Sequence, residues 1–399
     1  MMADDEQPLP LDFFDGLGVL RFESEILGRC SFRWTLPDRN LTKLQSVFVL
    51  DNLLQASAEC WGPVRVANVK GPISKKIIEE ATPTVETLKK LYGYGYTIVV
   101  NDIHEKIYLI REISDALKEA MLGQVNCNAY VTPAGCQGLK KHYDDHDVFV
   151  VQVAGVKKWE VYHPRFNMNP VATTQYSDDY NEACTEKTSY ELTSGDVLYI
   201  PAGFPHEAYC SAESASTHLS FSLQQLRVAD MARYITAQLE MAPDCKSPAR
   251  ERVSPSEIRA GSLMPGSAQA LLRLFHELTS KSQCPNTHGE VLYEYGKHCV
   301  RSDSRADVLL EPPPEHIDLD DTLHRSNAAQ CLLKYDGSEL SFPGGVLSGG
   351  ESELSVYAWM IDGENIAVRD LPGSSAVEKI DFAKDLIQAG FMKKKRAGI

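Results

Sequence analysis

Apolar residues recur at helical spacing through the N-terminal part of the chain. The pattern predicts a helical region over residues 40–57, a short strand at 97–100 and an amphipathic helix over 102–123. A Thr-Pro-Thr turn at 82–84 precedes another apolar repeat, which predicts a helix after it. The amphipathic helix places five large apolar side chains on one face: Ile107, Ile110, Ile113, Leu117 and Met121. This part is therefore expected to form a helical elaboration that packs on a core domain.

The pattern changes to short β-rich runs from residue 125 to residue 223. These runs are NAYVTP, DVFVVQVAG, KKWEVYHP, TSYELTSGDVLYIPAG, HEAYC and THLSFSL. A series of short strands separated by tight turns is typical of an antiparallel sandwich or barrel. The fold class is therefore predicted as mainly β with α+β additions.

Helical spacing returns after residue 224. Residues 228–241 and 267–278 are predicted helices, and the second has a broad leucine-rich face that suits pairing with another subunit or domain. Residues 283–399 combine short apolar runs (VLLEPP, LSFPGG, LSVYAWMI) with a last helix at 376–389, which favours a small α+β domain.

Composition narrows the possible classes of protein. The formal net charge of −15 argues against a protein whose main task is to bind nucleic-acid phosphates, and it suits a basic partner. The ten cysteines include no C-x-x-C pair, so zinc ribbons are not expected and free thiols in a reducing compartment are. We expect no signal peptide and no membrane span. The basic run at 393–396 is either a nuclear address or a solvated chain end.

The candidate chemistry lies in two pieces of the β-rich region. His142 and Asp144 form an H-x-D triplet before an apolar strand, and His206 follows the run GDVLYIPAGFP. An isolated H-x-D is usually a hydrogen-bonded pair at a strand start, but a distant third ligand changes the interpretation. Two imidazoles and one carboxylate on one face of a metal, with the other positions open, are typical of non-heme Fe(II) oxygenases.

An open site of this kind can bind a 2-oxoacid, whose far carboxylate needs a buried cation. Lys157 is the candidate, because the Ala-Gly pair at 154–155 marks a turn after which strand alternation starts afresh. Alternation also predicts that one of Lys157 and Lys158 faces solvent.

Two further strands offer polar side chains that share a face. His218 and Ser220 lie on one face of the strand at 217–222, and Asn128 and Tyr130 share a face ahead of the H-x-D triplet. In a small barrel these faces could line the lumen and bind the cosubstrate. A wet outer face fits the same alternation.

The stretches NAYVTPAGCQGLKKHYDDHDVFVVQVAGVKKWEVYHP and GDVLYIPAGFPHEAYCSAESASTHLSFSLQQ closely resemble the JmjC-type ribosomal oxygenases, which are Fe(II)- and 2-oxoglutarate-dependent protein hydroxylases of the bifunctional histidyl/arginyl type. The resemblance implies a double-stranded β-helix, a cupin-like jelly roll, within a catalytic domain at 1–226. It further implies a helical dimerisation region at 227–282 and a winged-helix-like domain at 283–399.

By position, the resemblance implies roles for several residues. His142, Asp144 and His206 correspond to the iron ligands, and Lys157 to the residue that binds the far carboxylate of 2-oxoglutarate. The pocket positions of the family are matched by Asn128, Tyr130, His218 and Ser220. A homodimer, and a histidine or arginine of a ribosomal protein as substrate, are also implied.

His146 departs from the family pattern, which usually has an aliphatic or aromatic residue there. It is either a substrate contact or a solvent-facing residue. The departure keeps hydroxylation of a peptide natural product or small molecule open. Histone demethylation and a non-enzymatic cupin or winged-helix binding protein are further alternatives, although the acidic tail makes DNA binding an unfavoured role. We expect a cytoplasmic or nuclear, including nucleolar, location.

Overall fold

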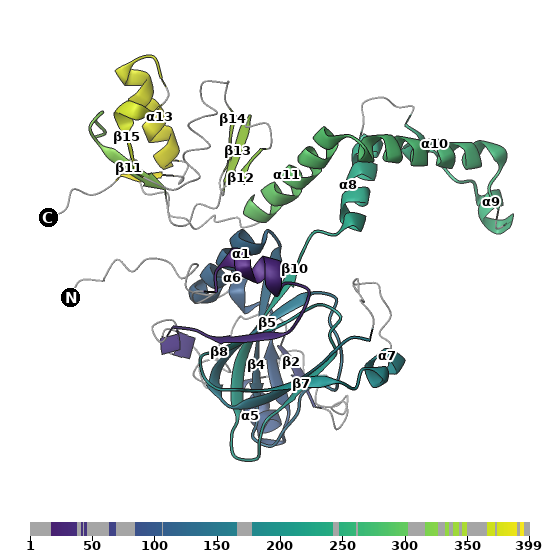
Figure 1. Cartoon of the computed structure of the whole chain (residues 1–399), viewed down its shortest axis with the longest axis vertical. Coiled ribbons are helices and arrows are strands. Elements are labelled where there is room, and N and C mark those ends of the chain that lie inside the picture. Colours follow the sequence, from purple (N-terminus) through teal and green to yellow (C-terminus); the bar gives the residue numbers. More distant parts are fainter. Residues whose placement is uncertain are drawn as a thin grey trace. The chain divides into compact units, whose positions relative to one another are not determined.

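The computed structural model divides the chain into two compact units, Met1–Gln225 and Leu226–Ile399, which are described separately (Figure 1). It describes residues 17–37, 41–42, 44–45, 64–68, 84–105, 107–165, 178–241, 247–260, 262–301, 316–325, 332–334, 338–342, 345–348, 365–371, 373–388 and 392–394. Most of the predicted helix at 40–57, the runs VLLEPP and LSVYAWMI, and part of the basic run at 393–396 lie outside these residues.

The first unit is built on two antiparallel sheets. The larger sheet has the order β1-β8-β5-β10-β4-β3-β2, and the smaller has the order β7-β6-β9. Its strands are β1 Phe32–Thr35, β2 Val64–Ala67, β3 Thr97–Val100, β4 Gln124–Thr132, β5 Asp147–Gly155, β6 Lys157–Tyr162, β7 Lys187–Leu192, β8 Asp196–Ile200, β9 His206–Tyr209 and β10 Ser216–Gln224. The predicted mainly β, cupin-like fold with helical additions is confirmed.

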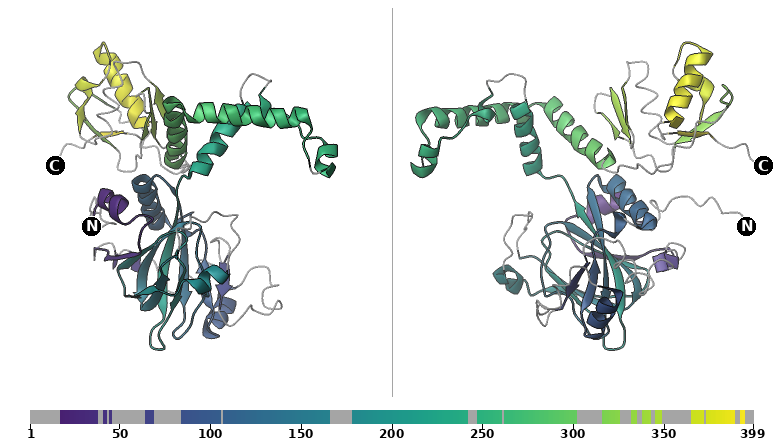
Figure 2. Two further views of the ribbon diagram at one scale, coloured as in Figure 1. Left: turned by 45° about the vertical axis from the view of Figure 1, so that its right-hand side comes forward. Right: turned by 180° about the vertical axis from the view of Figure 1, so that it is seen from behind.

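The strand β5 is buried along most of its length because both of its faces are covered. Val148 and Val150 pack toward the smaller sheet, in a cluster that includes Trp159. Phe149 and Val151 belong to the main core, which the helices complete. The helices of this core are α1 Val19–Glu25, α5 Val85–Gly93, η2 Ile103–Glu105 and α6 Tyr108–Met121. Figure 2 shows α1 (purple) and α6 (blue) close together at one end of the strands. Burial on two faces explains why the sequence of this strand is a nearly continuous run of apolar residues.

The helix predicted over 102–123 is shorter than expected. A 3₁₀ turn comes first, and α6 begins only at Tyr108, after Ile107 in an extended conformation. Asp102, which lies before the turn, has a φ of 53° and donates its backbone N–H to Asn128 Oδ1 at 2.9 Å. The extended backbone of Ile107, with a φ of −106° and a ψ of 113°, cannot continue a helix, so the 3₁₀ turn is separate from α6.

A tight connection joins β5 to β6. Gly155 has a φ of 70°, and a Cβ added to it would lie 1.8 Å from the carbonyl oxygen of Ala215. Only glycine meets both conditions. The connection restarts the strand alternation at Lys157, as predicted from the Ala-Gly pair.

The second unit begins with helices and continues with small sheets. The helices are α8 Val228–Met241, η3 Pro248–Arg250, α9 Pro255–Ala260, α10 Pro265–Ser282, α11 Pro285–Arg301, η4 Val368–Asp370 and α13 Ala376–Gln388. The strands are β11 Thr322–Arg325, β12 Leu332–Leu333, β13 Glu339–Phe342, β14 Gly345–Ser348, β15 Ile366–Ala367 and β16 Met392–Lys394. The predicted winged-helix character of this unit, and the division of the chain into three domains, stay predictions.

Two helices in this unit differ from the prediction. The helix predicted at 267–278 extends from Pro265 to Ser282. In residues 283–399, a helix that was not predicted, α11, occupies Pro285–Arg301. Proline at the first position of a helix is favourable, so Pro285 is a start signal for this helix. Within the described residues, no helix is both long and apolar enough to cross a membrane.

Candidate metal centre

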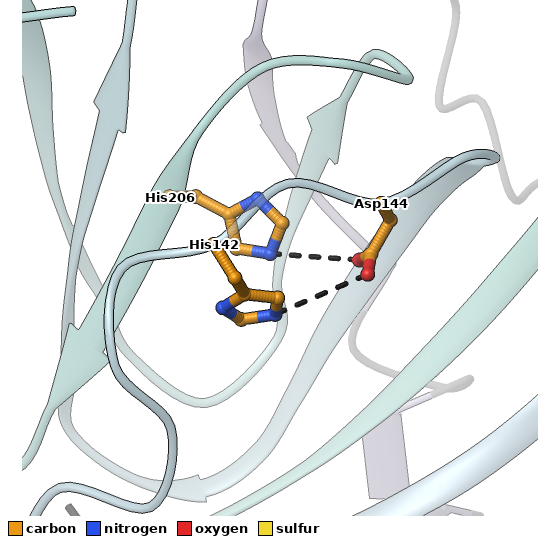
Figure 3. A group of neighbouring side chains, drawn as sticks. All are labelled: His142, Asp144 and His206. Atoms are coloured by element: carbon orange, nitrogen blue, oxygen red, sulfur yellow. Dashed lines mark ion pairs between the residues drawn. The ribbon is translucent and has the colours of Figure 1, made fainter. Parts of the chain in front are cut away.

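Three side chains from two distant segments meet at one end of the jelly roll. His142 and His206 form an isolated antiparallel bridge, in which His142 N donates to His206 O at 3.0 Å and His206 N to His142 O at 2.7 Å. Asp144 precedes β5, and its carboxylate oxygens lie 4.0 Å from His142 Nε2 and 3.6 Å from His206 Nε2 (Figure 3). The three ligand atoms lie within 4.8 Å of one another, close enough to bind a single metal ion.

Backbone carbonyls orient both imidazoles. His142 Nδ1 lies 2.7 Å from the carbonyl oxygen of Lys140, and His206 Nδ1 lies 3.0 Å from that of Phe204. A carbonyl only accepts hydrogen bonds, so each Nδ1 carries the proton and donates it. In the neutral ring, each Nε2 then keeps its lone pair, and it faces Asp144. Hydrogen bonds of this kind fix the tautomer and ring orientation of metal-binding histidines.

The charge states of the three groups also suit a cation. Burial, with the neighbouring His142, lowers the pKa of His206 to about 4, so this imidazole is neutral at pH 7. Burial opposes ionisation of Asp144, but the surrounding imidazoles outweigh it and the pKa of the carboxyl is lowered. The site therefore presents a neutral nitrogen of His206 and a negative oxygen of Asp144 beside His142.

The three side chains open into a cavity of about 510 Å³ that includes its mouth. Both sheets contribute to its wall. The lining residues are Thr97, Tyr130, Gly138, Leu139, His142, Asp144, Val148, Lys157, Trp159, His206, Glu207, Ala208, His218 and Ser220. Seven residues suggested by the sequence from separate strands and turns line this one space: Tyr130, His142, Asp144, Lys157, His206, His218 and Ser220.

Lys157 is a buried cation in the wall of this cavity. Its residue is 4% exposed, whereas the side chain of Lys158 is 44% exposed, so alternation places one lysine inside and the other outside, as predicted. Its Nζ donates to Thr132 Oγ1 at 3.0 Å, and the described residues supply it with no ion pair. Burial lowers its pKa to about 8. An ammonium held in the protein interior without a counter-ion favours an anionic ligand.

Aromatic rings form the wall beside Lys157. The ring of His218 stacks on Tyr130 with centroids 4.9 Å apart, and it meets the edge of Trp159 at 5.5 Å. Burial and the nearby Lys157 charge lower the pKa of His218 well below its usual range, so it is neutral. Its Nδ1 and the Nε1 of Trp159 have no hydrogen-bond partner among the described residues. Both nitrogens are therefore available to a ligand or to water.

Two residues singled out from the sequence lie elsewhere. Asn128 is not among the lining residues, since its Oδ1 accepts the N–H of Asp102. His146 is also outside the lining, and its Nδ1 lies 2.8 Å from Asp145 Oδ1. A role for His146 in substrate contact stays a prediction.

Sequence reasoning missed the two threonines behind Lys157. Thr97 Oγ1 donates to Thr132 Oγ1 at 3.2 Å, and both residues are almost fully buried. Thr132 was within reach of the sequence argument, because it follows Tyr130 by two positions on β4 and so shares its face. Thr97 comes from β3, and no local pattern pairs it with that position.

Residues 102–231 match the family model described as the JmjC domain. The chain is 36% identical over 138 residues to a "Bifunctional lysine-specific demethylase and histidyl-hydroxylase NO66" of Drosophila sechellia, which covers 34% of this chain and 21% of the relative. It is 38% identical over 113 residues to human "Ribosomal oxygenase 1", covering 27% of this chain and 17% of the relative. Residues 102–231 are thus similar to a JmjC domain, and about a third of the chain is similar to these relatives. The chain spans about a fifth of the length of the curated relatives that it matches.

The fold of the chain is also that of a solved structure. The Escherichia coli protein ycfD superposes with a TM-score of 0.51 at 16% sequence identity, over 95% of this chain and 98% of that chain. Another structure of YcfD, a ribosomal oxygenase, is a complex with cobalt and 2-oxoglutarate, and it matches with a TM-score of 0.50 at 15% identity. At this identity the likeness shows a shared fold over nearly the whole chain.

Proposed function

We propose that the chain is an Fe(II)- and 2-oxoglutarate-dependent oxygenase that hydroxylates a side chain of a protein or peptide. The observation that carries the proposal is the pairing of two features in one cavity. Two imidazoles and a carboxylate converge on one point, and a buried lysine that forms no ion pair with the described residues lies in the same wall. The first suits a divalent metal with open positions, and the second suits the far end of a dicarboxylate.

The donor set fits iron(II). His142, Asp144 and His206 would hold the metal from one side, with both imidazole rings already oriented by backbone carbonyls. Bound iron would supply the activation of dioxygen, with oxidative decarboxylation of 2-oxoglutarate as the source of electrons. The cobalt and 2-oxoglutarate of the E. coli neighbour support this assignment of cofactors.

The residues of the chain bind and orient. Lys157 would neutralise the far carboxylate of 2-oxoglutarate, and Thr132 fixes the position of its ammonium. His218 and Ser220 lie on the lining beside it, where they can meet the cosubstrate. Trp159 and Tyr130 add ring surface to the wall beside His218, which would limit water next to the reacting centre.

The substrate proposed is a histidine or arginine side chain of a ribosomal protein. The names of the relatives, histidyl-hydroxylase and ribosomal oxygenase, support it. A net charge of −15 suits a basic partner, and ribosomal proteins are commonly basic. Lysine demethylation is the second candidate, because the first relative also carries that activity in its name.

Intact-mass measurement distinguishes the two reactions. Iron-loaded protein, 2-oxoglutarate and air are incubated with ribosomal proteins and with methylated histone peptides. Hydroxylation adds one oxygen, about 16 Da, whereas demethylation removes about 14 Da per methyl group. A gain on a ribosomal protein that His142→Ala abolishes supports the proposal. A loss on the histone peptide alone would replace it with demethylation.

A homodimer and an intracellular, cytoplasmic or nuclear location complete the proposal. The exposed apolar side chains of α10, among them Leu272 at 69% and Phe275 at 57% exposure, support pairing of two copies. The free thiols of Cys127, Cys184 and Cys210 suit a reducing compartment. Light scattering on the purified protein, with Leu272→Glu as the variant, tests the dimer.

A further inference from the structure

A short helix lies beside the metal centre without contributing a ligand. The helix α7, Asp178–Ala183, follows β6 and precedes β7 in the chain, and it lies at the outside of the first unit (Figure 1). Tyr180 is 5% exposed, and Cys184, just past the helix, is fully buried. Both pack with Tyr143 and Tyr162 in a cluster separate from the main core. Most of the other described residues of α7 are exposed or charged, so this inward face is what attaches it.

The hydroxyl of Tyr180 reaches the turn that precedes His206. It donates to the carbonyl oxygen of Gly203 at 3.1 Å, within the protein interior. On its other side, Gly203 donates its N–H to the carbonyl oxygen of Asp144 at 2.9 Å. Gly203 therefore links Tyr180 to the backbone of the proposed ligand Asp144. It also lies three residues before the proposed ligand His206.

Two more contacts join α7 to the segment that bears His142 and Asp144. The ring of Tyr180 meets that of Tyr143, which lies between the two ligands, edge to face with centroids 5.4 Å apart at 87°. Lys141, next to His142, donates from Nζ to the carbonyl oxygen of Cys184 at 2.6 Å. The α7 segment thus touches both ligand-bearing segments, and each contact falls within three residues of a ligand.

We propose that Tyr180 is a positioning residue of the metal centre, acting through Gly203 and Tyr143 to hold the two ligand-bearing segments in register. The inference rests on the proposed metal site. Tyr180 touches no ligand atom, so its effect passes through the backbone of the Gly203 turn and the ring of Tyr143. Residues that contact the ligand-bearing segments without binding the metal hold the ligands in the geometry that the metal requires.

If Tyr180 had only a structural role, its substitution would have a different effect. The substitution would lower the stability of the fold and leave the metal affinity of the folded protein unchanged. Substitution of a positioning residue lowers the metal affinity and changes the geometry of the ligands while the protein stays folded. Metal affinity and the visible spectrum of bound cobalt(II) are therefore the readouts, and neither requires turnover.

The experiment compares wild type, Tyr180→Phe and Tyr180→Ala, with Tyr94→Phe as the matched control. Tyr94 is 76% exposed at the end of α5, so its hydroxyl is a solvent-facing counterpart. Full-length protein is titrated with Mn(II), and free Mn(II) is measured by electron paramagnetic resonance. Tyr180→Phe should bind Mn(II) about fivefold more weakly, the equivalent of one hydrogen bond. Tyr180→Ala, which also loses the ring, should bind still more weakly.

Cobalt(II) provides the second readout. The visible bands of the cobalt form should differ between wild type and Tyr180→Phe, and those of Tyr94→Phe should match wild type. Equal Mn(II) affinity and equal cobalt spectra for wild type and Tyr180→Phe would overturn the inference alone. Absence of Mn(II) binding by the wild-type protein would overturn the proposed metal site itself.

Discussion

Replacing Lys157 by methionine should raise the stability of the ligand-free protein and lower its affinity for 2-oxoglutarate by about 30-fold or more. The residue is 4% exposed and has no ion pair among the described residues, so its charge is held in the interior at a cost. Its pKa of about 8 lies below the ordinary value of 10.5. That difference corresponds to about 3 kcal/mol of free energy of unfolding at neutral pH. Methionine keeps the length of the side chain and removes the charge.

The pH dependence has a definite sign. Between about pH 8 and pH 10.5 the unfolded chain binds the proton of Lys157 more tightly than the folded chain, so the free energy of unfolding rises with pH. Affinity for 2-oxoglutarate moves in the opposite direction, because only the charged lysine pairs with a carboxylate. The dissociation constant should increase about tenfold from about pH 7 to about pH 9.

Two measurements test this reasoning. Urea unfolding of wild type and Lys157→Met gives the stability difference, and calorimetric titration of the Mn(II)-loaded proteins gives the affinity. Loss of one partner from a buried charge pair costs about 2 kcal/mol or more, so affinity should fall by about 30-fold or more. Lys158→Met, on the exposed side of the same strand, should match wild type in both. Unchanged affinity in Lys157→Met would refute the assignment of the cosubstrate site.

Three further predictions address the metal centre and the fold. His142→Ala should weaken Mn(II) binding by more than about 100-fold in an equilibrium titration, since it removes a ligand; an affinity equal to wild type would exclude His142 from the site. The free energy of unfolding of the metal-free protein should decrease as the pH falls from 6.5 toward about 4, because His206 binds a proton more tightly in the unfolded chain than in the folded one. In urea titrations, His206→Gln should reduce this dependence of the free energy of unfolding on pH. Gly155→Ala should lower the free energy of unfolding by about 2–4 kcal/mol. In the control Gly266→Ala, the added Cβ meets nothing within 4 Å, so the free energy of unfolding should change by less than about 1 kcal/mol. Equal effects of the two substitutions would contradict the close approach of Gly155 to Ala215.

The sequence predicted the parts of the site that depend on local rules. Alternation within β6, restarted at Gly155, placed Lys157 inside and Lys158 outside. The H-x-D triplet and the histidine after the Pro-Ala-Gly turn lie where a jelly roll brings its strand ends together. These predictions needed only strand periodicity and the spacing of known donor types.

The parts that were missed depend on contacts between distant segments. Asn128 shares a face with Tyr130, yet its side chain is taken up by the left-handed Asp102, a conformation that no local pattern reveals. Tyr180 reaches Gly203 from an insertion whose sequence shows no apolar periodicity. The helix α11 contains several residues of high β-propensity, so its sequence gives only a weak helical signal. Packing on its neighbours overrides that propensity.

Succinate formation tests the central claim most directly. Iron-loaded wild type and His142→Ala are incubated with 2-oxoglutarate, labelled dioxygen and a ribosomal protein fraction, and both succinate and substrate mass are recorded. Wild type should form succinate and transfer one labelled oxygen to a protein, while His142→Ala should do neither. Equal succinate from both proteins, or none from a wild type that binds iron and 2-oxoglutarate, would contradict the account.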